Sequence, residues 1–302
     1  RGNSFDAETH NLAVGVSALS GSVAGGEFNV AIGNYSLDAL TSGDNNTAIG
    51  YNAGTGITTG ASNTIIGEEA GIAITEGGGN VAVGMEALKN EDGHGLNTAV
   101  GTQTLFSQNA GADAYNVAVG YQAGAAITTG VRTIAVGGLA ADGYDTENDN
   151  LAIGHAALGG SVAGGEYNVA VGNYTLDALT SADSNVAIGY EAGTAITTGS
   201  SNVIIGADAA EAMTEGHSSV IIGQNAGASL TTGNSVVFVG QAAGDGHDTE
   251  TNNVGVGRAA LGGAIAGGEY NVAIGNNTLD ALTSADSNVA IGYVSGSAVT
   301  TG

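Results

Sequence analysis

The chain has 302 residues, of which 29 are Asp or Glu and only four are Lys or Arg, so its formal net charge is −25 at pH 7. This acidity excludes nucleic acid binding by phosphate neutralisation, and the lack of cysteine excludes disulfides and thiolate metal sites. The 54 glycines have no Gly-X-Y period and the chain has no proline, which excludes collagen, while 42% hydrophobic residues exclude a disordered chain. No apolar run approaches the roughly 18 residues that span a bilayer, so we expect no membrane insertion.

A five-residue run of the type Asn-Val-Ala-Ile-Gly recurs along the chain from Asn11 onward. Seventeen copies follow one another at steps of 17 residues, except for four steps of 18, 19, 18 and 18. The copies begin at Asn11, Asn29, Asn46, Asn63, Asn80, Asn97, Asn116, Thr133, Asn150, Asn168, Asn185, Asn202, Ser219, Val236, Asn253, Asn271 and Asn288. One apolar run in each short period is typical of a solenoid whose coil is one repeat.

Each copy, numbered from zero at its first residue, carries large aliphatic residues at positions one and three, such as Val186 and Ile188. Position two is usually Ala and position four is Gly. This alternation predicts a strand in every copy. We expect the Val/Ile face to line the interior of the coil and the Ala/Gly face to pack against backbone or another subunit. The stacked Asn residues at position zero are expected to form a hydrogen-bonded ladder.

A corner follows each strand, and two later positions add to the core. Position eight is mostly Gly or Leu, as in Gly193 and Leu176, and position eleven is usually apolar, as in Ile196 and Leu179. We therefore predict an all-β fold, a parallel β-solenoid (β-roll) of about seventeen 17-residue coils. It forms a single elongated repeat domain over residues 1–302, as a fragment of a longer chain. No cap is recognisable at either end, so we expect lateral association or capping by other parts.

The stretch 185–202 reads Asn-Val-Ala-Ile-Gly-Tyr-x-Ala-Gly-x-x-Ile-Thr-Thr-Gly-x-x-Asn, with close variants at 46–63 and 116–133. It resembles the head repeats of trimeric autotransporter adhesins and related tail-fibre repeats of bacteriophages and viruses. The resemblance covers residues 11–302 and implies a parallel β-roll that assembles as a homotrimer in a surface fibre. The coil differs from the adhesin heads, which typically have a shorter coil led by Ser.

Acidic residues in two turns are the best candidates for a metal site. They are Asp142, Asp145, Glu147 and Asp149, with Asp245, Asp248 and Glu250, and more faintly Glu91 and Asp92. Carboxylates with turn carbonyls nearby suit Ca²⁺, which takes six to eight oxygen ligands. The spacing fits neither an EF-hand nor the nine-residue calcium roll, and the alternative is a solvated insertion turn.

The chain shows no nucleophile with a base, no paired acids and no metal-ligand spacing, so we predict no enzyme and no other cofactor. The five histidines share no i, i+4 pairing and are expected to be solvated in loops. The tyrosines at position five either form a carbohydrate-stacking stripe or cover a corner. They are Tyr51, Tyr121, Tyr190 and Tyr293.

We predict a structural or adhesive fibre segment on a virion tail fibre or cell surface, outside the cell, which presents or performs attachment. A host surface receptor or glycan is the further partner. The alternatives are a self-assembling extracellular filament and an ice-binding type of solenoid, suggested by Thr-Thr pairs such as Thr197-Thr198. A glycan-cleaving tailspike would need two carboxylates about 5–10 Å apart in a groove, and no such pair is nominated.

Overall fold

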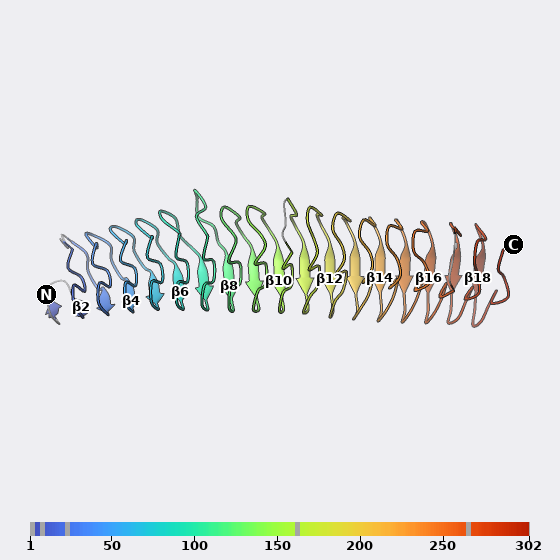
Figure 1. Ribbon diagram of the computed structural model, residues 1–302, viewed down its shortest axis with the longest axis horizontal. Helices are drawn as coiled ribbons and strands as arrows, with labels where there is room; N and C mark the ends of the chain where they lie inside the picture. Colours follow the sequence, from blue (N-terminus) through green and yellow to red (C-terminus); the bar gives the residue numbers. More distant parts are fainter. Residues whose placement is uncertain (1–3, 7–9, 22–24, 161–163, 264–266, 302) are drawn as a thin grey trace. The chain divides into compact units, whose positions relative to one another are not determined.

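The computed structural model describes residues 4–6, 10–21, 25–160, 164–263 and 267–301. The chain divides into two compact units, residues 1–149 and 150–302. Strands joined by turns make up all the regular structure of the described residues (Figure 1). Within these ranges there is therefore no helix that could cross a membrane.

In the first unit, parallel strands β2 to β9 pair in sequence order, with equivalent positions side by side, such as Ala31 beside Ala48. Strand β1 pairs antiparallel with β2, so it covers the edge of β2 that does not pair with β3. No sequence pattern predicts β1. The strands are β1 (Ser4–Asp6), β2 (Asn11–Val14), β3 (Val30–Ile32), β4 (Thr47–Ile49), β5 (Thr64–Ile66), β6 (Val81–Val83), β7 (Thr98–Val100), β8 (Val117–Val119) and β9 (Ile134–Val136).

The second unit repeats this arrangement with parallel strands β10 to β18. They are β10 (Leu151–Ile153), β11 (Val169–Val171), β12 (Val186–Ile188), β13 (Val203–Ile205), β14 (Val220–Ile222), β15 (Val237–Val239), β16 (Val254–Val256), β17 (Val272–Ile274) and β18 (Val289–Ile291). Each of the seventeen predicted runs thus contains a parallel strand, so the all-β parallel solenoid is confirmed within each unit. The single domain over residues 1–302 and the homotrimer stay predictions.

The buried Asn residues at position zero form the expected ladder. Asn185 donates from Nδ2 to Oδ1 of Asn168 (3.2 Å) and to the carbonyl oxygen of Gly199 (2.9 Å). The backbone N–H of Asn185 donates to the same Oδ1 (3.0 Å). The same three bonds recur at Asn46, Asn63, Asn202 and Asn271. Each amide therefore joins neighbouring coils and also closes its own coil, 14 residues later.

The strands face the opposite way to the prediction. Ala187 at position two of β12 is fully buried, whereas Ile188 at position three is 39% exposed. The interior is filled by large side chains from the corners, such as Leu176 and Ile196, which are themselves fully buried. In most coils only a small strand residue fits opposite them, so Val and Ile point outward. Alternation identifies two faces, but the volume of the interior decides which of them is buried.

Position eight adjusts the volume of the core. Leu176 fills the space beside Gly193 of the next coil, where a Cβ atom would lie 3.1 Å from Leu176 Cδ2. Phe238 is a large inward strand residue, and position eight of the same coil is Gly244, where a Cβ would lie 2.5 Å from the ring. The two kinds of copy seen in the sequence are therefore complementary in packing.

Candidate functional site

An aliphatic stripe follows the outer face of the strands in each unit. We call the side chains at positions one and three the outer stripe. In the second unit they are Leu151, Ile153, Val169, Val171, Val186, Ile188, Val203, Ile205, Val220, Ile222, Val237, Val239, Val254, Val256, Val272, Ile274, Val289 and Ile291. In the first unit the stripe is similar but includes three threonines, Thr47, Thr64 and Thr98. The in-register pairing places like residues beside one another along each stripe.

The stripe is partly open to solvent and carries no charge on β2 to β18. Val119 and Ile134 in the first unit are 37% and 40% exposed, and Ile153 and Ile274 in the second are 38% and 39% exposed. Apolar surface that extends over many neighbouring strands is typical of sites of protein association. Covering it removes aliphatic area from water without desolvating a charge.

In the first unit, the predicted calcium residues stabilise their own turn. Glu147 is buried, and its Oε2 accepts hydrogen bonds from the backbone N–H groups of Asp145 (2.9 Å) and Thr146 (3.0 Å). Asp149 forms a bidentate ion pair with Arg132, whose Nε and Nη2 donate to Oδ1 (2.6 Å) and Oδ2 (2.7 Å) of the carboxylate. The hydrogen bond from Arg132 lowers the pKa of the Asp149 carboxyl.

The remaining first-unit candidates border this turn. Asp142 is half-buried, and the exposed Asp145 carboxylate accepts a hydrogen bond from the Thr128 hydroxyl. Most of the carboxyl groups placed here thus already have a structural role.

The second unit repeats the motif. Glu250 is buried, and its Oε2 accepts from the backbone N–H groups of Asp248 (3.0 Å) and Thr249 (3.2 Å). Its Oε1 accepts from the backbone N–H of Gly267 in the next coil (2.8 Å). Asp245 is half-buried, and burial raises the pKa of its carboxyl. Glu147 and Glu250 therefore cap equivalent turns.

The described residues contain two groups of three side chains whose ligand atoms all lie within 4.8 Å of one another. They are Glu91, Asp92 and His94, and Glu191, Asp208 and Glu211. None of the seven residues predicted in the two acidic turns belongs to either group. Calcium binding in those turns stays a prediction.

His247 contradicts the expectation that the histidines are solvated. The side chain occupies position eleven, is fully buried, and packs edge-to-face on Phe238 with ring centroids 4.8 Å apart. Among the described residues, neither ring nitrogen has a hydrogen-bond partner. Burial lowers the pKa of His247 to about 4, although Glu250, the Leu261 backbone and Asp248 act in the opposite direction. The ring is therefore neutral near pH 7.

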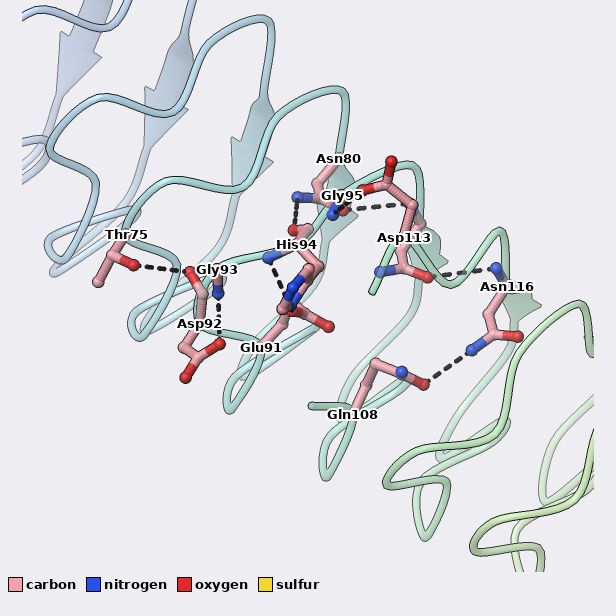
Figure 2. A network of polar contacts seen from close by, with 11 residues as sticks. Thr75, Asn80, Glu91, Asp92, Gly93, His94, Gly95, Gln108, Asp113 and Asn116 are labelled. Atoms are coloured by element: carbon pink, nitrogen blue, oxygen red, sulfur yellow. Dashed lines mark hydrogen bonds and ion pairs between the residues drawn. The ribbon is translucent and has the colours of Figure 1, made fainter. Parts of the chain in front are cut away.

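Glu91 also occupies position eleven and is fully buried. Its Oε1 accepts a hydrogen bond from the backbone N–H of His94 (3.2 Å) and lies 3.8 Å from Nδ1 of that ring. In the described part of the chain, Oε2 of Glu91 has no hydrogen-bond partner. Burial raises the pKa of the Glu91 carboxyl, and the hydrogen bond from the backbone N–H of His94 offsets part of the rise. Figure 2 shows the carboxyl group beside the His94 ring.

In the sequence, Glu91 and Asp92 form only a fainter version of the acidic turns, and His94 is expected to be solvated in a loop. The register of the repeat contains the missing signal. Glu91 and Gln108 stand at position eleven of two consecutive copies, where Ile74 and Ile127 stand in the copies on either side. Two adjacent polar residues in an apolar column indicate a buried polar cluster.

The Thr-Thr pairs and the tyrosines differ in how far their side chains are available to a binding partner. The hydroxyl groups of Thr58 and Thr197 donate to carbonyl oxygens of the next coil, each at 3.2 Å, so they serve the solenoid itself. Tyr51 and Tyr190 are about half exposed. Tyr35 packs edge-on against Tyr51, with ring centroids 6.1 Å apart. The tyrosines are therefore available at the surface.

No protein-family model, curated protein or solved structure matched the chain. The resemblance to adhesin and tail-fibre repeats thus stays a prediction.

Proposed function

We propose that the chain is a structural segment of an extracellular fibre, belonging to a virion tail fibre or a cell-surface adhesin. It assembles as a homotrimer through the outer stripe and presents or performs attachment to a host receptor or glycan. The observation that supports this proposal best is the uncharged aliphatic stripe on the outer face of every strand from β2 to β18.

A second copy of the chain is the partner that fits this stripe. Each chain has a formal charge of −25, so two copies repel one another over most of their surface. At the stripe, two copies can contact each other without bringing like charges together. In a threefold arrangement each stripe faces the common axis, and the acidic surface faces solvent and neighbouring fibres.

The stripe is large enough for stable association. Fully burying a Val or Ile side chain contributes about 1.5–3 kcal/mol, so a member that is about one-third exposed contributes about 0.5–1 kcal/mol when a partner covers it. The eighteen members in the second unit together contribute on the order of 10 kcal/mol. Association costs about 4–15 kcal/mol in lost freedom, and the first unit contributes further.

The test is the solution mass of the chain by light scattering coupled to size exclusion. We expect a mass about three times 29.0 kDa at micromolar concentration. A mass of 29.0 kDa at every concentration would overturn the proposal. Species that grow with concentration would favour an open filament over a closed trimer.

A matched pair of variants shows whether the stripe is the contact surface. Ile222→Glu places a charge on the stripe at β14, and Gln224→Glu places the same charge on an exposed position two residues later. We expect Ile222→Glu to lower the mass to that of the monomer and Gln224→Glu to leave it unchanged. Circular dichroism confirms that both variants keep their strands. Equal masses for the two variants would refute the role of the stripe.

A further inference from the structure

The turn that carries Glu91 is held in place from several coils. The Thr75 hydroxyl donates to the carbonyl oxygen of Asp92 (3.0 Å), and Nδ2 of Asn80 donates to the carbonyl oxygen of His94 (3.2 Å). The backbone N–H of Gly95 donates to Oδ1 of Asp113 (3.0 Å). These bonds, drawn in Figure 2, fix the backbone of residues 92–95 without using the free atoms of Glu91 and His94.

Unpaired polar atoms occur in this coil and in the next one. Within the described residues, Oε2 of Glu91, Nδ1 of His94, Nδ2 of Asn97 and Nε2 of Gln108 are all buried atoms without a hydrogen-bond partner. Gln108 uses its other amide atom, Oε1, to accept from Asn116 Nδ2 (2.8 Å), as Figure 2 shows. A buried carboxylate oxygen left unpaired costs free energy unless a further group satisfies it.

The available cation does not satisfy Glu91. Lys89 lies two residues away in the chain, but its Nζ is bound to Glu69 at 2.9 Å and to Glu86 at 2.6 Å. The carboxyl group of Glu91 thus has His94 as its ion-pair partner, at 3.8 Å, which is too long for a hydrogen bond.

The three side chains form a ligand set of a recognisable kind. One oxygen each from Glu91 and Asp92 and one nitrogen from His94 lie within 4.8 Å of one another. Two ligand atoms 3.8 Å apart can both lie about 2.0–2.2 Å from one ion between them. Asp92 is exposed and the His94 side chain is one-third exposed, so an ion can reach the site. A Cβ atom on Gly93 would meet nothing within 4 Å, so there is open space beside it.

We propose that Glu91, Asp92 and His94 form a binding site for Zn²⁺ in the turn between β6 and β7. An imidazole nitrogen with two carboxylate oxygens suits Zn²⁺ and other first-row transition ions, whereas Ca²⁺ takes oxygen ligands. The bound ion neutralises the buried Glu91 carboxylate and links it to Asp92 and His94 at the exposed edge of the same turn. Water completes the coordination.

The test is titration of the intact chain with zinc chloride by isothermal calorimetry, with calcium chloride as a second arm. We expect one saturable Zn²⁺ site per chain that calcium does not displace. Titration with Co²⁺ gives a second readout, because Co²⁺ held in a four- or five-coordinate site absorbs visible light more strongly than the hydrated ion does.

Two variants identify the ligands. Glu91→Leu places at position eleven the residue that stands there in other coils, such as Leu40 and Leu230, so the core stays filled. His94→Asn changes a partly exposed side chain and keeps the turn. Loss of an outer-shell partner already costs about 10–100-fold in affinity, so we expect each variant to lose at least 100-fold.

The control is Glu191→Gln with Glu211→Gln, in the other group of three carboxylates. We expect that variant to keep the Zn²⁺ site and its Co²⁺ absorption. Equal zinc binding by all variants would mean diffuse attraction to an acidic surface and would overturn the proposal. Calcium binding as tight as zinc binding, or no saturable zinc site, would overturn it as well.

Discussion

Replacing His247 by Leu should make the surrounding coils more resistant to acid. The folded-state pKa of His247 is about 4, against an ordinary value of 6.5, because the ring is buried. The unfolded chain therefore binds a proton on this side chain at a higher pH than the folded chain does. This group costs no stability above pH 6.5, and its cost grows as the pH falls and reaches its full size below about pH 4.

The difference of about 2.5 pKa units corresponds to about 3 kcal/mol of stability lost between pH 6.5 and pH 4. A Leu side chain, as at Leu230 one coil earlier, does not titrate and fits the same column. The advantage of the variant should therefore grow by about 1.4 kcal/mol for each pH unit in this range.

Hydrogen exchange followed by mass spectrometry measures this effect locally, since a repeat protein opens in parts. Wild type and variant are compared at the same pH, so the intrinsic exchange rate and the titration of shared carboxylates cancel. We expect peptides covering β15 and β16 to become better protected in the variant as the pH falls, and peptides from the first unit to stay the same. His217→Asn, at an exposed histidine of the same unit, is the control. Parallel pH profiles for wild type and His247→Leu would refute the reasoning.

Three further changes test the core and the turns. Leu176→Ala removes a fully buried side chain that packs beside Gly193, and should cost about 2–5 kcal/mol in thermal or urea unfolding; a cost under about 1 kcal/mol would contradict this packing. Gly189→Ala should prevent soluble expression, because its Cβ would lie 2.5 Å from the Gly206 carbonyl oxygen at a φ of +137°; a well-folded variant would contradict the stacking. Glu250→Ala leaves three backbone N–H groups without their acceptor and should lower local stability by about 1–3 kcal/mol for each group that water does not reach. Hydrogen exchange of residues 246–252 measures that loss, and unchanged exchange would exclude the capping role.

The coil and its strands follow from the sequence because the pattern repeats with a nearly fixed step. The ladder of Asn185 and its equivalents was also predicted correctly, because identical amides one coil apart can hydrogen-bond only to each other or to the backbone. The sequence pattern did not predict which face of each strand points into the interior of the coil. Val186 and Ala187 define two faces, but the corner residue Leu176 fills the interior and leaves room there only for Ala. That balance of volumes is a property of the whole coil.

The site residues were harder to predict because their roles depend on the folded turn. Glu147 reads as a candidate metal ligand in sequence, yet its carboxylate reaches the backbone N–H groups of its own turn. Glu91 could have been found by aligning all copies at position eleven, where it replaces an apolar residue. The antiparallel strand β1 has no repeat pattern at all, so only its pairing with β2 identifies it.

The packing of Leu37 beside Gly54 limits which duplications and deletions in the gene keep the core intact. These residues belong to consecutive coils and share one volume, since a Cβ on Gly54 would lie 3.2 Å from Leu37 Cδ2. Three near copies in the sequence, residues 22–60, 161–199 and 264–302, each contain such a Leu and its Gly. A duplication of that length therefore brings both halves of the contact with it, whereas loss of a single coil would separate them. At these contacts, the shortest stretch that can be copied with the packing intact is a pair of coils.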